Sequence, residues 1–350
     1  MKISYKGFVI SLALSAAIAG CGGSGSSSGS PVPPAEVHKF AQTNLISDQP
    51  GAAVQDADLL NPWSIASSAN GPFWVTDNAS GKATIYNTAG AKQGLVVNVS
   101  GPRNNPNSPA TGEIFNSTPS FVIPGGARSI FIFSTLDGVI SAWSGGNQSV
   151  VVADRSGNGA GYTGLALGNV GGNNFLYATN FVGGTVDVFD ANFGFVRSFT
   201  DPGIPRGFTP FGIRNIDGHL FVTYAKLHAG RGNGFVDVFA TDGTLLKRLV
   251  TGAALDSPWG LAKAPDGFGG FHNALLVGNF GDGRINAFDI DSGATLGVVG
   301  DANGRPIVLD GLWALTFGNG IAGGLADNLY FTAGIGGEKH GLFGFLAPAP

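Results

Sequence analysis

The hexapeptide NPWSIA at Asn61–Ala66 returns almost unchanged as SPWGLA at Ser257–Ala262. Weaker copies of the pattern are TPSFVI from Thr118, YTGLAL from Tyr162, TPFGIR from Thr209 and DGLWAL from Asp310. Each copy holds one small residue, and these recur at intervals of 44 to 56 residues: Ser64, Ser120, Gly164, Gly212, Gly260 and Ala314. A repeat of this length is typical of propeller blades.

The same series of short segments follows each copy. An apolar run such as FWVT from Phe73 comes first, then a turn with glycine, then a strand that ends in an aromatic residue. Asp-Gly pairs such as Asp217-Gly218 and Asp242-Gly243 favour hairpin turns. Three or four short alternating strands per unit predict a four-stranded antiparallel sheet. Six units therefore predict an all-β fold, a six-bladed β-propeller with four-stranded blades.

The ends of the repeat region predict how the ring closes. The last unit stops at Phe345–Leu346 after its third strand, while Phe40–Ser47 is an apolar strand outside the six units. We expect this N-terminal strand to complete the last blade and to cover the open sheet edges. The segment Gly101–Asn116 is interpreted as an insertion after the first unit. A β-helix would need shorter repeats, and a sandwich does not predict six copies of one pattern.

These units resemble the blades of NHL-repeat and gluconolactonase-like six-bladed propellers. The runs NPWSIA, FWVTDNASG, NGFVDVF, SPWGLA, ALLVGNFGDGRINAFD and LYFTAG more closely resemble an uncharacterised family of secreted bacterial propeller proteins. The likeness covers residues 38 to 346. It implies the propeller fold and brings no known activity with it.

Charge and cysteine content narrow the function classes. The formal net charge is −4, and only 12% of residues are charged. Nucleic-acid binding needs a basic surface that neutralises phosphates, so we expect no nucleic-acid partner. The chain has one cysteine, which excludes an intramolecular disulfide and a cysteine-based zinc site. We expect a monomer that binds a small ligand or an envelope protein.

The N-terminus predicts export and lipid attachment. Lys2 and Lys6 precede the apolar segment Phe8–Ile18, which is too short to span a bilayer. The following Ile-Ala-Gly-Cys, ending at Cys21, resembles the lipobox of bacterial lipoproteins, which implies cleavage before Cys21 and acylation of that residue. We therefore expect a signal peptide at 1–20, a Gly/Ser/Pro tether at 21–37 and a propeller at 38–350. The expected location is the cell envelope, at the outer membrane.

The candidate ligand site lies at the mouth of the central channel, where the first strand of each unit begins. The residues before the small residues are mostly aromatic, and we expect four of them to line a pocket: Trp63, Phe211, Trp259 and Trp313. Polar contacts are expected from residues that end the second strands: Asp77, Asn180, Tyr224 and Asn279. The aromatic residues could instead pack between blades, and the polar ones could cap turns.

No metal or cofactor is expected. Gluconolactonase-like propellers hold a divalent cation with a glutamate and Asn or Asp side chains, one of them just before the inner-strand glycine. Trp259, Phe211 and Thr163 occupy that place here, and none is a calcium ligand. The histidines show no metal-like spacing: His38, His219, His228, His272 and His340. The loop Lys226–Asn233 adds a small basic spot, read as solvated or as a contact for an anionic group.

These observations favour an envelope-anchored, non-catalytic binding propeller with an aromatic-lined site. Two alternatives stay open. One is a divergent lactonase- or lyase-type enzyme, which would show a metal or titratable groups with perturbed pKa values in one pocket. The other is a purely structural assembly module, which would show an exposed apolar patch and a filled channel.

Overall fold

The computed structural model describes residues 36–252 and 254–349. Strands dominate this part of the chain, whose helical elements are α1 (Ile335–Glu338) and three short 3-10 turns. The expected all-β fold is confirmed. None of the helices in these two ranges is long and apolar enough to cross a membrane. The predicted signal peptide, Cys21 and the tether up to residue 35 lie outside the described residues.

Sixteen strands form four antiparallel sheets of four, each built from consecutive strands. The first contains β3 (Pro62–Ala66), β4 (Phe73–Asp77), β5 (Lys82–Tyr86) and β6 (Lys92–Asn98). The second contains β7 (Ala110–Phe115), β8 (Phe131–Thr135), β9 (Val139–Trp143) and β10 (Val150–Asp154). The third contains β11 (Tyr162–Val170), β12 (Asn173–Asn180), β13 (Thr185–Phe189) and β14 (Phe195–Phe199). The fourth contains β15 (Thr209–Ile216), β16 (His219–Ala225), β17 (Phe235–Ala240) and β18 (Leu245–Thr251).

The remaining strands form a nine-stranded sheet. One half runs through β19 (Pro258–Lys263), β20 (Leu275–Asn279), β21 (Ile285–Phe288) and β22 (Thr295–Gly300). The other half runs through β23 (Leu312–Phe317), β24 (Leu329–Ala333), β25 (Leu342–Pro348) and β1 (Glu36–Ser47), to which β2 (Val54–Gln55) is attached.

The N-terminal strand β1 pairs with the C-terminal strand, as the sequence predicted. It lies antiparallel to β25 from Phe40 to Ser47. Its first residues also pair in parallel with β22, which joins the two halves of the nine-stranded sheet and was not foreseen. Because β1 bonds on both sides, it covers two edges that would otherwise be free to pair with another chain.

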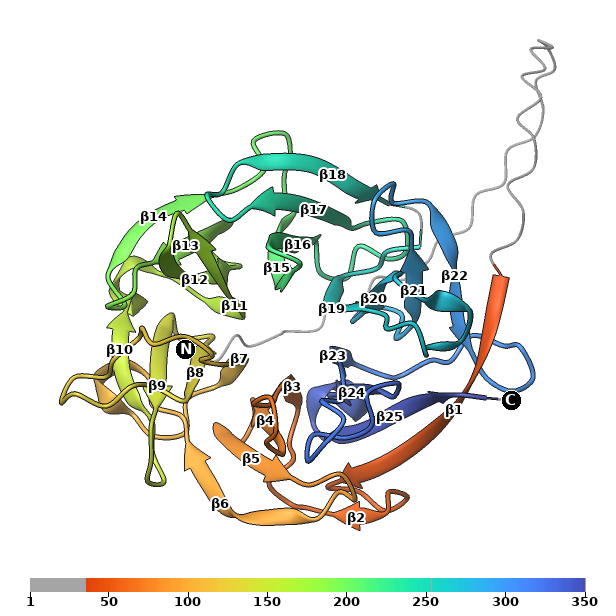
Figure 1. Ribbon diagram of the computed structural model, residues 1–350, viewed down its shortest axis with the longest axis horizontal. Helices are drawn as coiled ribbons and strands as arrows, with labels where there is room; N and C mark the ends of the chain where they lie inside the picture. The colour runs from red at the N-terminus through yellow and green to blue at the C-terminus, as the bar shows by residue number, and fades with distance from the viewer. Residues whose placement is uncertain (1–35, 253, 350) are drawn as a thin grey trace, which may run out of the picture. The chain divides into compact units, whose positions relative to one another are not determined.

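Within residues 36–349 the sheets stand around a common centre (Figure 1). The strands nearest that centre are β3, β7, β11, β15, β19 and β23. Each contacts the next, and β23 contacts β3, so these strands close a ring. This is the arrangement of a β-propeller, in which first strands line the axis.

Close approach between neighbouring sheets explains the small residue of the repeat. A Cβ atom on Gly212 would lie 2.1 Å from the carbonyl oxygen of Trp259. A Cβ atom on Gly260 would lie 2.5 Å from the carbonyl oxygen of Trp313. At these two positions the residue before the next small residue brings its backbone against the preceding sheet, and a larger side chain than glycine would push the sheets apart.

Buried hydroxyls on the second strands tie these contacts together. The Thr76 hydroxyl accepts a hydrogen bond from the backbone N–H of Ser64 (3.1 Å) and donates one to the carbonyl of Thr111 in the next sheet (2.8 Å). The Thr332 hydroxyl accepts from the N–H of Ala314 and donates to the carbonyl of Trp63 in the same way. The sheets are therefore linked by hydrogen bonds near the axis as well as by apolar packing.

One predicted unit is corrected. The sequence copy from Thr118, with Ser120 as its small residue, is not a first strand, because these residues follow β7 in a loop. The inner strand is β7, inside the segment Gly101–Asn116 that was interpreted as an insertion. Gly112 is its small residue, since its N–H donates to the Ser134 hydroxyl as Ser64 does to Thr76. The match at Thr118 was coincidental, and ATGEIF departs from the pattern by a glutamate.

Candidate functional site

The four aromatic residues predicted for the site come together at the axis. Trp63 stacks on Trp313 with ring centroids 3.7 Å apart, and Phe211 and Trp259 meet the Trp63 ring edge-on at 6.4 and 6.3 Å. Phe280 stacks on the other side of Trp313 at 4.2 Å. We call these five residues the aromatic cluster. The four predicted members are only 2% to 8% exposed, so their rings mainly pack against one another.

The aromatic cluster separates two pockets. Ser257, just before β19, lines one pocket, Trp259 within β19 belongs to the cluster, and Leu261 lines the other pocket. The same order holds at β23 for Gly311, Trp313 and Leu315. The pocket lined by residues from the middle and the ends of these strands, such as Leu261, is called the inner-strand pocket. The pocket beside the loops that precede these strands, lined by residues such as Ser257, is called the loop pocket.

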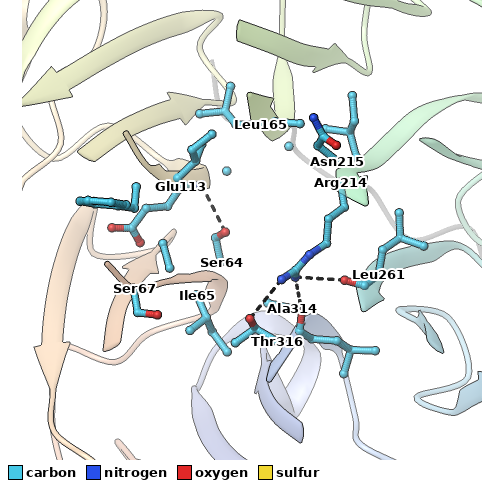
Figure 2. Close-up of a pocket in the computed structure, with 18 of the residues that line it drawn as sticks. Ser64, Ile65, Ser67, Glu113, Leu165, Arg214, Asn215, Leu261, Ala314 and Thr316 are labelled. Atoms are coloured by element: carbon cyan, nitrogen blue, oxygen red, sulfur yellow. Dashed lines mark hydrogen bonds between the residues drawn. The ribbon is translucent and has the colours of Figure 1, made fainter. Parts of the chain in front are cut away.

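The inner-strand pocket has a volume of about 450 Å³. Its walls come from the middle and ends of β3, β7, β11, β15, β19 and β23, and Trp259 contributes from the aromatic cluster. Figure 2 shows aliphatic side chains such as Ile65, Leu165 and Leu261 around it, with the Arg214 side chain reaching across. A cavity of this size, with convergent polar groups, matches the usual dimensions of small-molecule sites.

Arg214 is held by neutral acceptors on two other strands. Its Nη1 donates to the carbonyl oxygens of Leu315 (2.8 Å) and Leu261 (3.1 Å), and its Nη2 donates to the Thr316 hydroxyl (3.3 Å). The surrounding protein lowers the pKa of the guanidinium by desolvation. An arginine nevertheless remains protonated in proteins. The pocket therefore contains a fixed positive charge.

Glu113 is the other ionisable residue of this pocket, and it is buried. Its backbone N–H donates to the Ser64 hydroxyl (3.2 Å), while neither carboxyl oxygen has a hydrogen-bond partner among the described residues. Burial raises the pKa of this carboxyl well above its ordinary value, and the nearby Asp77 raises it further. Glu113 is therefore expected to be neutral at pH 7, because a buried carboxylate without a partner is strongly disfavoured.

Both residues are departures from the repeat, which is the signal that sequence reasoning missed. In the second unit, Glu113 follows the small residue. In the other five units the residue at this position is aliphatic: Ile65, Leu165, Ile213, Leu261 and Leu315. In the fourth unit, Arg214 occupies the next position. Three other units have alanine at this position: Ala66, Ala166 and Ala262. A charge at a position that its repeat makes apolar or small is a marker that could have been read from the sequence.

The loop pocket has a different character. It measures about 390 Å³ and is lined by Phe280, several glycines and acidic side chains, among them Asp256 and Glu338. Burial raises the pKa of Asp256, and the neighbouring Asp282 adds to the rise. The Glu338 carboxylate accepts a hydrogen bond from the Asn61 amide (3.1 Å). Desolvation also raises the pKa of Glu338, although the residue is exposed at the surface.

The four polar residues predicted as ligand contacts do not line either pocket. All four are buried near the ends of second strands: Asp77, Asn180, Tyr224 and Asn279. The Asn180 amide oxygen accepts from the backbone N–H groups of Gly161 and Gly183, and the Tyr224 hydroxyl accepts from that of Asp201. These contacts fix turns and neighbouring segments of the propeller itself.

Asp77 and Asn279 also make hydrogen bonds within the propeller. One carboxyl oxygen of Asp77 accepts from the Thr84 hydroxyl (2.7 Å), and burial raises the pKa of this group well above its ordinary value. The Asn279 amide donates to the carbonyl of Ala254 (2.7 Å) and to Asp282 (2.9 Å). A role for these residues in ligand binding stays a prediction.

No group of three or more His, Cys, Asp or Glu side chains in the described part of the chain is arranged to hold a metal ion. His340 instead pairs with Asp48 (2.6 Å), and His228 lines the loop pocket. In the loop Lys226–Asn233, Arg231 lies 3.5 Å from Asp282, so part of its basic charge faces an acidic neighbour.

Comparison with other sequences identifies relatives. Two uncharacterised proteins of Acanthamoeba polyphaga mimivirus are 31% and 32% identical to this chain, each over 319 aligned residues. Both alignments cover 84% of this chain, and they cover 76% and 82% of the two relatives. The chain belongs to this family. No protein-family model matches it. These family members are viral, so the expected bacterial and exported origin stays a prediction.

Comparison with solved structures supports the propeller fold. A gluconolactonase from Xanthomonas campestris superposes with a TM-score of 0.56 at 15% identity, covering 91% of this chain and 95% of the enzyme. A virginiamycin B lyase from Staphylococcus aureus gives 0.53 at 15% identity, covering 88% and 99%. At such low identity the likeness concerns the fold alone.

Proposed function

We propose that this family member is a binding propeller that takes up a small molecule in the inner-strand pocket without a covalent step. The observation that carries the proposal is the cavity of about 450 Å³ at the axis, with Trp259 of the aromatic cluster in its wall. Apolar stacking and a few oriented donors suffice to bind a small ligand in such a cavity. The predicted aromatic site is thereby refined, with Trp259 at the ligand and the rest of the cluster as support.

We further propose that the ring has six blades. The nine-stranded sheet consists of two runs of four strands, which meet only through the parallel pairing of β1 and β22. Counting each run as one blade, together with the four separate sheets, gives one blade for every strand that faces the axis. The N-terminal strand would then be the outer strand of the sixth blade.

The location is proposed from the sequence. Lipidation of Cys21 would anchor the propeller to the cell envelope, with the Gly/Ser-rich tether as a spacer. Several acyl chains give stable anchoring, whereas one chain binds only reversibly. Metabolic labelling with a palmitate analogue would test this, with Cys21→Ser as the unlabelled control. Labelling that persists in the variant would refute the anchor.

Energy transfer from tryptophan to a bound dye tests the binding site. N-phenyl-naphthylamine is neutral and fluoresces in apolar sites, so binding in the inner-strand pocket should quench Trp259. The variant Trp259→Phe should lower the quenched fraction of the tryptophan emission. The control Trp143→Phe should raise it, because Trp143 lies in the third strand of its sheet, away from the axis (Figure 1). Equal quenching in both variants, or no saturable binding, would overturn the proposal.

A further inference from the structure

The inner-strand pocket carries one positive charge that no acidic side chain balances. Arg214 and Glu113 are the only ionisable residues among those that line it, and Glu113 is expected to be neutral at pH 7. Figure 2 shows the Glu113 carboxyl turned away from the Arg214 guanidinium. No ion pair involving Arg214 occurs in residues 36–252 and 254–349. Because buried charges are usually paired, this arrangement points to a missing negative partner.

The hydrogen bonds of Arg214 fix the guanidinium and leave part of it free. Its three bonds to Leu261, Leu315 and Thr316 all come from the two Nη atoms and all go to neutral oxygens. The Nε–H and one further Nη2–H have no acceptor within the described ranges. Nε is not fully buried, because the fully buried atoms that lack a partner do not include it. A guanidinium with fixed orientation and spare donors can grip a planar or tetrahedral acid group through two parallel bonds.

The rest of the pocket limits what can accompany the acid group. Its volume of about 450 Å³ suits a molecule of modest size. The Trp259 ring and the aliphatic side chains Ile65, Leu165 and Leu261 provide surfaces for a carbon skeleton. The hydroxyls of Ser64 and Ser67 border the same space and can serve as further donors.

We propose that the inner-strand pocket selects small organic anions, carboxylates or sulfonates, whose acid group is bound by Arg214. This inference rests on the proposed function, because it names the ligand class of the same pocket. It assigns specificity to Arg214, at a position where three other units have alanine. The protein would then distinguish ligands by their charge.

A matched pair of dyes tests this directly on the full chain. Anilinonaphthalene sulfonate is N-phenyl-naphthylamine with one added sulfonate, so the two dyes differ essentially in charge. We expect the wild-type protein to bind the sulfonate at least about tenfold more tightly, as befits hydrogen bonds to charged groups. Octanoate should displace the sulfonate dye, whereas octanol at the same concentration should not.

Two Arg214 variants provide the decisive comparison. Arg214→Met keeps the aliphatic stem and removes the charge, so the advantage of the sulfonate dye should vanish while the neutral dye binds within about twofold of wild type. Arg214→Ala is expected to fold because alanine occupies this position in three other units, and it should also lose the advantage. Arg197→Met removes a charge from the outer strand β14 and should change neither dye.

The outcomes separate the two proposals. If neither dye binds saturably or transfers energy from Trp259, the proposed function itself fails. If both dyes bind with equal affinity, or if Arg214→Met and Arg214→Ala keep the preference for the sulfonate, anion selection is wrong and the proposed binding pocket stands. If Arg214→Met does not fold, judged by its near-ultraviolet circular dichroism, then Arg214→Ala and the octanoate competition on the wild type decide.

Discussion

The two ends of the central channel share one aromatic cluster and differ in almost everything else. The inner-strand pocket is walled by regular strands and contains a fixed arginine beside a buried glutamate. The loop pocket is built from turns, with acidic side chains and glycine backbone around Phe280. Regular strands hold side chains in place, whereas loops of glycine and acid are free to vary. If the proposed function holds, residues on the strands, and not those in the loops, set the selectivity.

The largest effect should follow from removing the wall between the pockets. Trp313 is 2% exposed and stacks on both Trp63 and Phe280. Trp313→Ala should lower the free energy of unfolding by about 3–5 kcal/mol and connect the two pockets. Urea unfolding measures the loss. Trp313→Phe is the milder control, since it keeps one ring and loses the bond to Asn61 (2.9 Å) together with part of the indole's volume. A loss below about 1 kcal/mol in Trp313→Ala would mean that the cluster does not support the ring.

A matched pair of carboxyl variants sharpens the contrast between the pockets. The folded-state pKa of Glu113 is raised above its ordinary 4.5, so the native state binds its proton more tightly than the unfolded state does. This stabilisation is complete below the unfolded pKa and declines, by up to about 1.4 kcal/mol per pH unit, as pH rises toward the folded pKa. Glu113→Leu restores the aliphatic residue of the repeat and should remove this decline.

Unfolding experiments at pH 5 and pH 8 measure the difference. Glu113→Leu should gain stability over the wild type between these values, whereas Glu338→Gln in the loop pocket should stay within about 0.5 kcal/mol because Glu338 is an exposed residue. A wild-type protein whose stability does not fall relative to Glu113→Leu would show that Glu113 is ionised in the native state. Asp77 is also buried with a raised pKa and interacts with Glu113, so the pH dependence that remains in Glu113→Leu belongs in part to Asp77.

The smallest effect concerns the residue that connects the two regions. Asn61 accepts from the Trp313 indole (2.9 Å) and donates to Glu338 (3.1 Å), and its φ of 48° lies in the left-handed region. Asn61→Gly tolerates that backbone and removes both bonds, so it should cost about 1–2 kcal/mol. Asn61→Asp keeps the acceptor and loses the donor, and it should lie between glycine and wild type. A larger loss in Asn61→Asp than in Asn61→Gly would point to repulsion from Glu338 as the stronger effect.

The fold was largely predictable because the repeat is written in local patterns. Short alternating strands, Asp-Gly turns and one small residue per unit indicate four-stranded sheets around an axis, and the N-terminal strand beside β25 followed from the missing strand of the last unit. The second unit was misplaced because β7 carries Glu113 where the pattern has an aliphatic residue, so the match at Thr118 looked better.

The sequence by itself determined the strand pattern, the low charge and the gathering of aromatic residues before the small positions. Only the tertiary structure decided that these rings fill the channel and divide it, because strands far apart in sequence bring them within stacking distance. It also showed which contacts these four residues make within the propeller, with turns and neighbouring segments: Asp77, Asn180, Tyr224 and Asn279. The tertiary structure also fixes the Arg214 guanidinium, because it bonds to carbonyl groups on β19 and β23 that lie about 50 and 100 residues away in the chain.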